Sequence, residues 1–221
     1  MNKSRFRSLV GPIYVINLSH RTDRWRECCL EFSGNDINQD EVVRFEAVSS
    51  NIHGSIGCAY SHAAVLMRFL LESDEPHCLV LEDDFKFILP MDHIVREIES
   101  VVLSSDVWDA LLLAGNMVFS FETRNPSIVR VYESLTTSAY IIKREAAPKL
   151  IERFLTGANR LKETLPVLAR NNWGEIIKRY SADVVWHQLQ MTDPWFMLNP
   201  CVVVQRPSFS DVMNEHVDYK A

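Results

Sequence analysis

Three consecutive carboxylates, Glu82 to Asp84, directly follow the apolar run Cys78–Leu81. The run is long enough for a buried strand, so the carboxylates stand where a predicted strand leaves the core. A tight turn after a strand can bring two of three neighbouring carboxylates to one point. Their oxygens are the ligands that Mg²⁺ and Mn²⁺ prefer, and a bound cation would offset their mutual repulsion. The alternative is a solvated acidic turn with Lys86 as its counter-charge.

A second polar group accompanies the apolar segment 13–18. Asn17, Arg21 and Arg24 lie at and just after this predicted strand. A guanidinium group makes bidentate contacts with phosphate, so both arginines are candidates for phosphate binding. Arg24 could instead belong to the solvated face of the helix that follows.

The stretch GSIGCAYSH, residues 54–62, joins glycines to side chains that can bind or react. Gly57 permits a close approach of the backbone to a ligand. Ser61 and His62 would enter the first turns of a helix and bind phosphate or sugar hydroxyls there. Cys58 and His62 are four residues apart on one helical face, which suggests a Cys/His nucleophile, although no third orienting residue is visible. A structural His62 bonded to a backbone carbonyl is the competing interpretation.

The elements that must position these residues follow an α/β pattern, because short apolar runs alternate with amphipathic stretches. Strands are predicted at residues 13–18, 42–48, 78–81, 110–114, 139–143 and 199–205. Helices are predicted at residues 23–32, 58–73, 92–102, 144–155 and 181–191. Residues 156–172 are interpreted as an insertion or mobile segment, and residues 212–221 as a tail. Open α/β sheets bind ligands outside the carboxyl ends of their strands, where the acidic triplet would lie.

Composition narrows the class of protein. The 221 residues include 23 Lys plus Arg against 29 Asp plus Glu, a net charge of −6, which argues against nucleic acid as a partner. Contact with a membrane would be peripheral at most. Five cysteines, two of them adjacent, fit free thiols in a reducing compartment. No signal-peptide core or spanning segment is visible, so a cytoplasmic location is expected.

Five motifs occur in order along residues 13–211: YVINLSHRTDR, GSIGCAYSH, LVLEDDF, TSAYIIKREAAPKL and PCVVVQRPSFSD. Together they resemble glycosyltransferase family 25, which contains lipooligosaccharide galactosyltransferases and collagen hydroxylysine galactosyltransferases. The resemblance implies a GT-A-like fold in a single domain, with a Rossmann-type mixed sheet flanked by helices. It also implies an inverting, metal-dependent transfer of a hexose, galactose or glucose, from a UDP-sugar.

The resemblance assigns roles to the acidic triplet and its surroundings. Asp84 would ligate the Mn²⁺ or Mg²⁺ that bridges the UDP diphosphate, and Asp83 or Glu82 would contact the ribose or complete the metal shell. The metal would stabilise negative charge on the departing UDP. The residues predicted to bind the donor are Asn17, Arg21, Arg24, Gly57, Ser61, His62, Asp83 and Gln205.

An inverting transfer also needs a base on the acceptor hydroxyl. Asp183 matches the family position of an Asp that precedes a short helix, although it could equally be a helix cap. His187, one turn later, could orient Asp183, contact substrate or ligate the metal. Asp193 and Asp211 are lesser candidates for the base.

The acceptor implied by the resemblance is a glycan, a glycolipid such as lipooligosaccharide, or a hydroxylated protein side chain. Thr137 and Ser138 belong to the motif expected on the acceptor side. Two other function classes remain open on the residues alone. One is a metal-dependent phosphohydrolase on a Rossmann-like sheet, and the other is a non-catalytic protein that binds nucleotide sugars or glycans.

Overall fold

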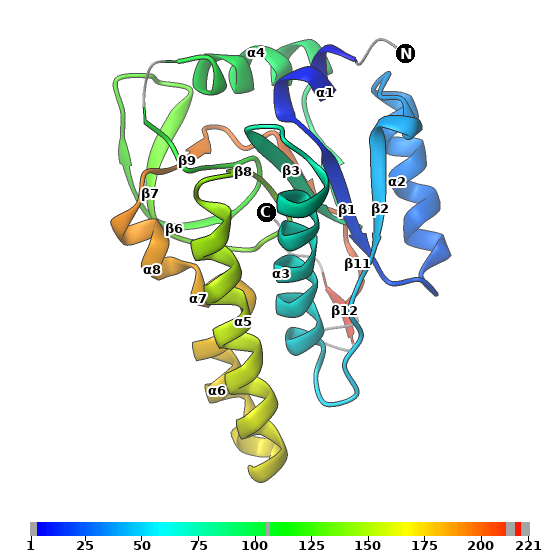
Figure 1. Cartoon of the computed structure of the whole chain (residues 1–221), viewed down its shortest axis with the longest axis vertical. Helices are drawn as coiled ribbons and strands as arrows, with labels where there is room; N and C mark the ends of the chain where they lie inside the picture. Colours follow the sequence, from blue (N-terminus) through cyan, green and yellow to red (C-terminus); the bar gives the residue numbers. More distant parts are fainter. Residues whose placement is uncertain (1–3, 105–106, 211–214, 218–221) are drawn as a thin grey trace.

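An eight-stranded mixed sheet lies between two layers of helices in the computed structural model, which describes residues 4–104, 107–210 and 215–217 (Figure 1). In spatial order the strands are β2 (Val42–Glu46), β1 (Ile13–Asn17), β3 (His77–Glu82), β8 (Ala139–Lys143), β5 (Ala110–Leu112), β9 (Trp195–Leu198), β7 (Ile128–Leu135) and β6 (Asn116–Glu122). Strand β8 is antiparallel to both of its neighbours, and so is β7, whereas β2, β1 and β3 run parallel.

The central strands are buried on both faces, so each contributes to two cores. In β3, Cys78 and Val80 face one hydrophobic cluster, and Leu79 and Leu81 face the other. Alternation of side chains along a strand explains this division, and it requires helices on both sides of the sheet. The predicted α/β class, with a Rossmann-type mixed sheet flanked by helices, is therefore confirmed.

Two sets of helices cover the sheet. The helices are α1 (Arg5–Val10), α2 (Thr22–Gly34), α3 (Gly54–Glu72), α4 (Met91–Val102), α5 (Ala147–Thr164), α6 (Trp173–Tyr180), α7 (Ala182–Val185) and α8 (His187–Thr192). Residues of α1, α2 and α4 belong to one core cluster, and residues of α3, α5, α7 and α8 belong to the other. Figure 1 shows α3 beside α5, with α5 and α6 extending together beyond the sheet. Short 3₁₀ turns occupy Gln39–Glu41, Leu165–Val167 and Arg170–Asn172.

Two small ladders complete the fold. Strand β4 (Phe85–Phe87) pairs antiparallel with β10 (Val203–Gln205), and β11 (Ser208–Ser210) pairs with β12 (Glu215–Val217). The β4–β10 ladder places Gln205 opposite Phe85, directly beside the acidic turn that follows β3. The ladder thereby holds Gln205 at the edge of the sheet where β1 and β3 end.

Every predicted strand has a counterpart, but three strands of the sheet were not predicted. They are β6, β7 and β9, which build the sheet edge beyond β5. Strand β7 carries the polar residues Arg130, Glu133 and Ser134 among its apolar ones, and β9 is four residues long. Pairing with neighbouring strands, rather than a strong apolar period, determines these strands.

The boundaries of three predicted helices, at residues 144–155, 181–191 and 58–73, are wrong. Helix α5 continues through Gly157 to Thr164, although a helix ending at residue 155 was predicted. A Cβ on Gly157 would lie 2.6 Å from the carbonyl oxygen of Tyr180, so this glycine allows close packing of α5 on the C-terminal end of α6. The helix predicted at 181–191 is divided into α7 and α8 at Trp186, whose buried indole donates to the Ser134 carbonyl.

Helix α3 starts at Gly54, four residues before its predicted start, with His53 as the N-cap. Helix α2 starts at Thr22, one residue before its predicted start, with Arg21 at the N-cap position. Among the described residues, no helix has the length and apolar character needed to cross a membrane.

Candidate active site

Asp83 and Asp84 of the acidic triplet are buried and Glu82 is partly buried, which rules out the solvated-turn alternative. Glu82 is the last residue of β3, and Asp83 and Asp84 form the turn into β4. Asp83 is 6% exposed and Asp84 is 5% exposed, whereas Lys86 points to solvent. Buried carboxylates must be paired, protonated or bound to a cation, so the turn requires a specific partner.

Arg24 of α2 is that partner for Asp83. Its guanidinium lies 2.5 Å from Asp83 Oδ1 and 3.5 Å from Asp84 Oδ2. Arg24 is 9% exposed, so it does not belong to a solvated helix face. The structure therefore places Arg24 as a counter-charge inside the acidic turn, where the sequence suggested a phosphate contact.

Asn17, at the end of β1, connects the turn to β2. Its side-chain amide donates to Asp83 Oδ2 at 2.6 Å, and its oxygen accepts from Arg44 at 2.6 Å. Arg44 was not predicted; the only signal was a cation inside the otherwise apolar segment VVRF. The guanidinium of Arg44 also lies over the Trp25 ring, which links β2 to α2.

Asp84 has weaker side-chain hydrogen bonds than Asp83. Its nearest side-chain donor with a hydrogen bond is Gln205 Nε2, at 3.4 Å. Burial and the charge of Glu82 raise the pKa of Asp84 to about 7, although Arg24 opposes the shift. Gln205 Oε1 is itself buried without a hydrogen-bond partner in the described part of the chain. A weakly held carboxylate beside an unpaired amide oxygen forms a place for a hard cation.

Glu82 turns toward α3. Its Oε1 accepts from the Thr137 hydroxyl at 2.6 Å and lies 3.2 Å from His62 Nε2. The other ring nitrogen of His62 lies 3.0 Å from the Tyr140 hydroxyl. Burial raises the pKa of Glu82, but the contacts with His62 and Thr137 outweigh it and lower that pKa below its ordinary value. His62 therefore contacts side chains rather than a backbone carbonyl.

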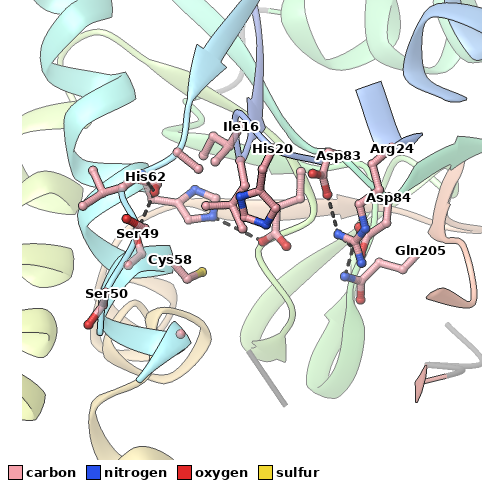
Figure 2. Close-up of a pocket in the computed structure, with 17 residues that line it drawn as sticks. Ile16, His20, Arg24, Ser49, Ser50, Cys58, His62, Asp83, Asp84 and Gln205 are labelled. Atoms are coloured by element: carbon pink, nitrogen blue, oxygen red, sulfur yellow. Dashed lines mark hydrogen bonds and ion pairs between the residues drawn. The ribbon is translucent and has the colours of Figure 1, made fainter. Parts of the chain in front are cut away.

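One cavity of about 330 Å³ is lined by Arg24, His62, Glu82, Asp83, Asp84 and Gln205. Its volume is within the range of small-molecule sites. Figure 2 shows Cys58 and His62 toward one end of it, and Asp84 with Gln205 toward the other. The remaining wall is partly apolar and comes from the end of β1 and the segment after β2. The lining residues outside the acidic turn and α3 include Ile16, Leu18, His20, Ala47, Val48, Ser49 and Ser50.

Gly57 and Ser61 hold this wall in place. A Cβ on Gly57 would lie 2.3 Å from the Val48 carbonyl oxygen, so only glycine allows α3 to approach the segment so closely. Ser61 Oγ donates to the Gly57 carbonyl at 2.7 Å and accepts from the Val48 amide at 2.8 Å. Ser61 is the eighth residue of α3, so it lies two turns from the helix N-terminus that was expected to help it bind phosphate.

Predicted residues divide into those that the cavity brings together and those outside it. Lining the cavity are Arg24, Gly57, Ser61, His62, Glu82, Asp83, Asp84 and Gln205. Asn17 lies behind Asp83, and Arg21 pairs with Asp23 at 2.9 Å on the surface of α2.

Asp183 and His187, the predicted base and its partner, are not among the residues that line the cavity, and they have different hydrogen-bond partners. Asp183 Oδ1 accepts from Ser181 Oγ at 2.7 Å, as a first-turn acid of α7 does. Burial, and then the charges of Glu82 and Asp183, raise the pKa of Cys58 well above its ordinary value. Helix α7, which carries Asp183, contacts α3, which carries Cys58. His187 Nε2 lies 3.2 Å from the Ser134 carbonyl oxygen, at β7. Of the lesser candidates, Asp193 pairs with Lys149, and Asp211 lies outside the described residues.

Comparison with known proteins assigns no family. No family model and no curated protein matches the sequence. Among solved structures, the chain is similar to a protein from STIV at a TM-score of 0.41 and 14% identity, covering 84% of this chain and 80% of that one. For mannose-1-phosphate geranyltransferase from Thermus thermophilus the TM-score is 0.43 and the identity 9%, with 88% and 61% covered. For a glycosyltransferase involved in glycosylation of the major capsid of PBCV-1 the values are 0.41 and 9%, with 85% and 92% covered.

Similarity at this level assigns neither a family nor a reaction to the chain. The chain spans 61% of the length of the Thermus protein, so that protein is also substantially longer. The residues of the cavity are therefore the basis for assigning a function to the chain.

Proposed function

We propose that the protein is an inverting, metal-dependent hexosyltransferase that uses a UDP-sugar, with UDP-galactose or UDP-glucose as donor. The acceptor would be a hydroxyl of a glycan or a lipooligosaccharide-type glycolipid, with a hydroxylated protein side chain as a further acceptor class. The ordered motifs that resemble glycosyltransferase family 25 support this proposal, and so does the charge of the cavity.

The charge of the cavity is the observation that carries the proposal. Three carboxylates line it, at Glu82, Asp83 and Asp84, against one guanidinium, at Arg24. A nucleoside diphosphate would be repelled by this excess of negative charge. A divalent cation between the carboxylates and the diphosphate removes the repulsion, and Mg²⁺ and Mn²⁺ are usually held in this shared way.

The residues present fit such a cation. Asp84 and Glu82 are the proposed carboxylate ligands, and the unpaired Gln205 Oε1 supplies a further oxygen. When bound, the cation would stabilise negative charge on the departing UDP. Arg24 and Asn17 keep Asp83 in place through hydrogen bonds, so Asp83 would support the site or contact the ribose.

The partly apolar wall of the cavity suits the uracil base. Ile16, Leu18, Ala47 and Val48 line it, beside the hydroxyl of Ser49. A flat heterocycle binds in an apolar slot that also presents a few polar groups. Gly57 and Ser61 would act indirectly, by holding the Val48 segment.

Asp183 is the proposed base for the acceptor hydroxyl. It stands on α7, which contacts the helix α3 that carries Cys58 and His62. A carboxylate on this element could accept the proton of an acceptor hydroxyl bound beside the cavity. Asp183→Asn is expected to retain UDP binding and to lose transfer.

Calorimetric titration of UDP, once with Mn²⁺ and once with EDTA, tests the donor assignment without knowledge of the acceptor. Binding is expected only with Mn²⁺ and is expected to be lost in Asp84→Asn. Asp40→Asn is the matched control, because Asp40 is an exposed acid of a 3₁₀ turn that does not line the cavity.

The opposite results are equally informative. Equal binding with Mn²⁺ and EDTA would remove the metal role of Asp84. Absence of UDP binding, together with rapid release of phosphate from simple esters, would instead support a phosphohydrolase. UDP-sugar binding without transfer to any acceptor would support a non-catalytic binding protein.

A further inference from the structure

A cluster of three different ligand types lies at the end of the cavity away from Asp84. Its members are Cys58, His62 and Glu82, and one ligand atom from each lies within 4.8 Å of the other two. Cys58 and His62 are one turn apart on α3, and Glu82 closes the group from the end of β3. Figure 2 shows the Cys58 sulfur and the His62 ring at the same end of the cavity.

We propose that Cys58, His62 and Glu82 bind one Zn²⁺ ion, at a site that meets the proposed Mn²⁺ or Mg²⁺ site at Glu82 and takes its other two ligands from α3 rather than from Asp84 and Gln205. A thiolate with an imidazole selects Zn²⁺ over Mg²⁺ or Mn²⁺, because the softer ligands suit the softer ion. Three protein ligands facing a cavity leave a fourth position for water or substrate, which is the arrangement of catalytic rather than structural zinc sites.

The distances agree with tetrahedral coordination. His62 Nε2 and Glu82 Oε1 are 3.2 Å apart. Nitrogen and oxygen ligands at about 2.0–2.1 Å from a tetrahedral zinc ion are separated by about 3.3 Å. The Cys58 sulfur lies within 4.8 Å of both atoms, and it would have to approach to about 3.5 Å from each to complete a tetrahedral site.

Neighbouring groups orient the ligands. The Tyr140 hydroxyl lies 3.0 Å from His62 Nδ1, and the Phe154 ring packs against the imidazole with centroids 5.2 Å apart. These contacts fix the ring so that Nε2 faces Glu82. The Thr137 hydroxyl donates to the same Glu82 oxygen at 2.6 Å. Hydrogen bonds of this kind normally hold the ligands of a metal site.

Binding of Zn²⁺ would release one proton and leave no net charge at the site. The thiol of Cys58 releases one proton to solvent, and neutral His62 carries its remaining proton on Nδ1, where it can donate to Tyr140. Zn²⁺ with one thiolate and one carboxylate is neutral overall, which suits a largely buried position. Without the metal, an Nε2–H of His62 would bond Glu82 directly, and this is the competing structure.

Titration of the chelator-treated protein with Co²⁺ and Zn²⁺ distinguishes the zinc-bound site from the direct hydrogen bond between His62 and Glu82. We expect one equivalent of Co²⁺ to bind and to give a near-ultraviolet thiolate-to-metal charge-transfer band, which one equivalent of Zn²⁺ then removes. Cys58→Ala is expected to lose the band and to bind Zn²⁺ at least about tenfold more weakly. Cys29→Ala is the matched control, since Cys29 is a partly buried thiol on α2 outside the cavity.

A Co²⁺ complex without the thiolate band, or unchanged Zn²⁺ affinity in a folded Cys58→Ala protein, would overturn the proposal. If Cys58→Ala does not fold, His62→Gln is the second test, because other free cysteines could also bind Co²⁺. An unchanged band and unchanged Zn²⁺ affinity in His62→Gln would overturn the proposal. Neither UDP nor Mn²⁺ is present in this experiment, so its failure leaves the donor proposal intact, and loss of UDP binding leaves this one intact.

Discussion

Asp83 and Asp84 are adjacent in the chain and have different surroundings. Asp83 accepts close hydrogen bonds from Arg24 and Asn17, whereas the Gln205 amide is 3.4 Å from Asp84. Successive residues of a turn point in different directions, so neighbouring carboxylates acquire unrelated partners. The ionised form of Asp84 is therefore less stabilised by hydrogen bonds than that of Asp83, as expected for a carboxylate that binds a cation.

Asp84→Asn is expected to stabilise the metal-free protein at about pH 8. The pKa of Asp84 is raised from 3.8 to about 7 by burial and by Glu82, so ionisation of this group favours the unfolded chain. The gain in unfolding free energy would be at most about 4 kcal/mol above pH 7 and would vanish as the pH falls toward 4. Urea denaturation in EDTA at several pH values measures it. Equal stability of the two proteins at about pH 8 would contradict the raised pKa.

At the scale of elements, the position of α3 determines the shape of the cavity. The helix presents Cys58 and His62 to the end of β3, and it contacts the segment after β2 through Gly57 and Ser61. The close contact of α3 with this segment depends on the absence of a side chain at Gly57.

Gly57→Ala is expected to displace the segment that carries Val48, because the added Cβ would lie 2.3 Å from the Val48 carbonyl oxygen. Overpacking of this kind costs roughly 1–3 kcal/mol of unfolding free energy. We expect weaker UDP binding as well, measured by the same titration with Mn²⁺. Gly174→Ala on α6 is the control, since nothing lies within 4 Å of its added Cβ. Unchanged stability and UDP affinity in Gly57→Ala would show that α3 shifts without effect on the cavity.

At the scale of the whole molecule, the cavity is built from segments that are remote in sequence. Residues 16–24, 47–62 and 82–84 meet there, together with Gln205 from near the end of the chain. The two cores on either side of the sheet hold these segments in register. Binding in the cavity should therefore be coupled to global unfolding rather than to a local change.

UDP with Mn²⁺ is expected to raise the free energy of global unfolding by about 2.7 kcal/mol at a ligand concentration of 100 times Kd. Chemical denaturation followed by tryptophan fluorescence and by circular dichroism measures this shift. Coincident shifts of both probes are expected, because Trp108, Trp186 and Trp195 are buried in the two cores. A shift confined to one probe would indicate local rather than global coupling.

Local sequence signals predicted the central strands and the place of the acidic triplet at a strand end. Cys78–Leu81 is continuously apolar because β3 is covered on both faces, and such a run is readable without a structure. Strands β6, β7 and β9 carry a weaker signal, since pairing partners determine them. The continuation of α5 through Gly157 was not predicted, because the residues that pack against this glycine, Tyr180 and Val185, lie more than 20 positions later in the chain.

The sequence by itself determined the α/β class, the carboxylates after β3 and the residues from which a site could be made. Only the tertiary structure decided their partners: Arg24 with Asp83, Gln205 with Asp84, and His62 with Glu82. These pairs are separated by 20 to 121 positions along the chain. A local pattern encodes burial and periodicity, whereas the contacts that set charge and hydrogen bonding form only when distant segments pack together.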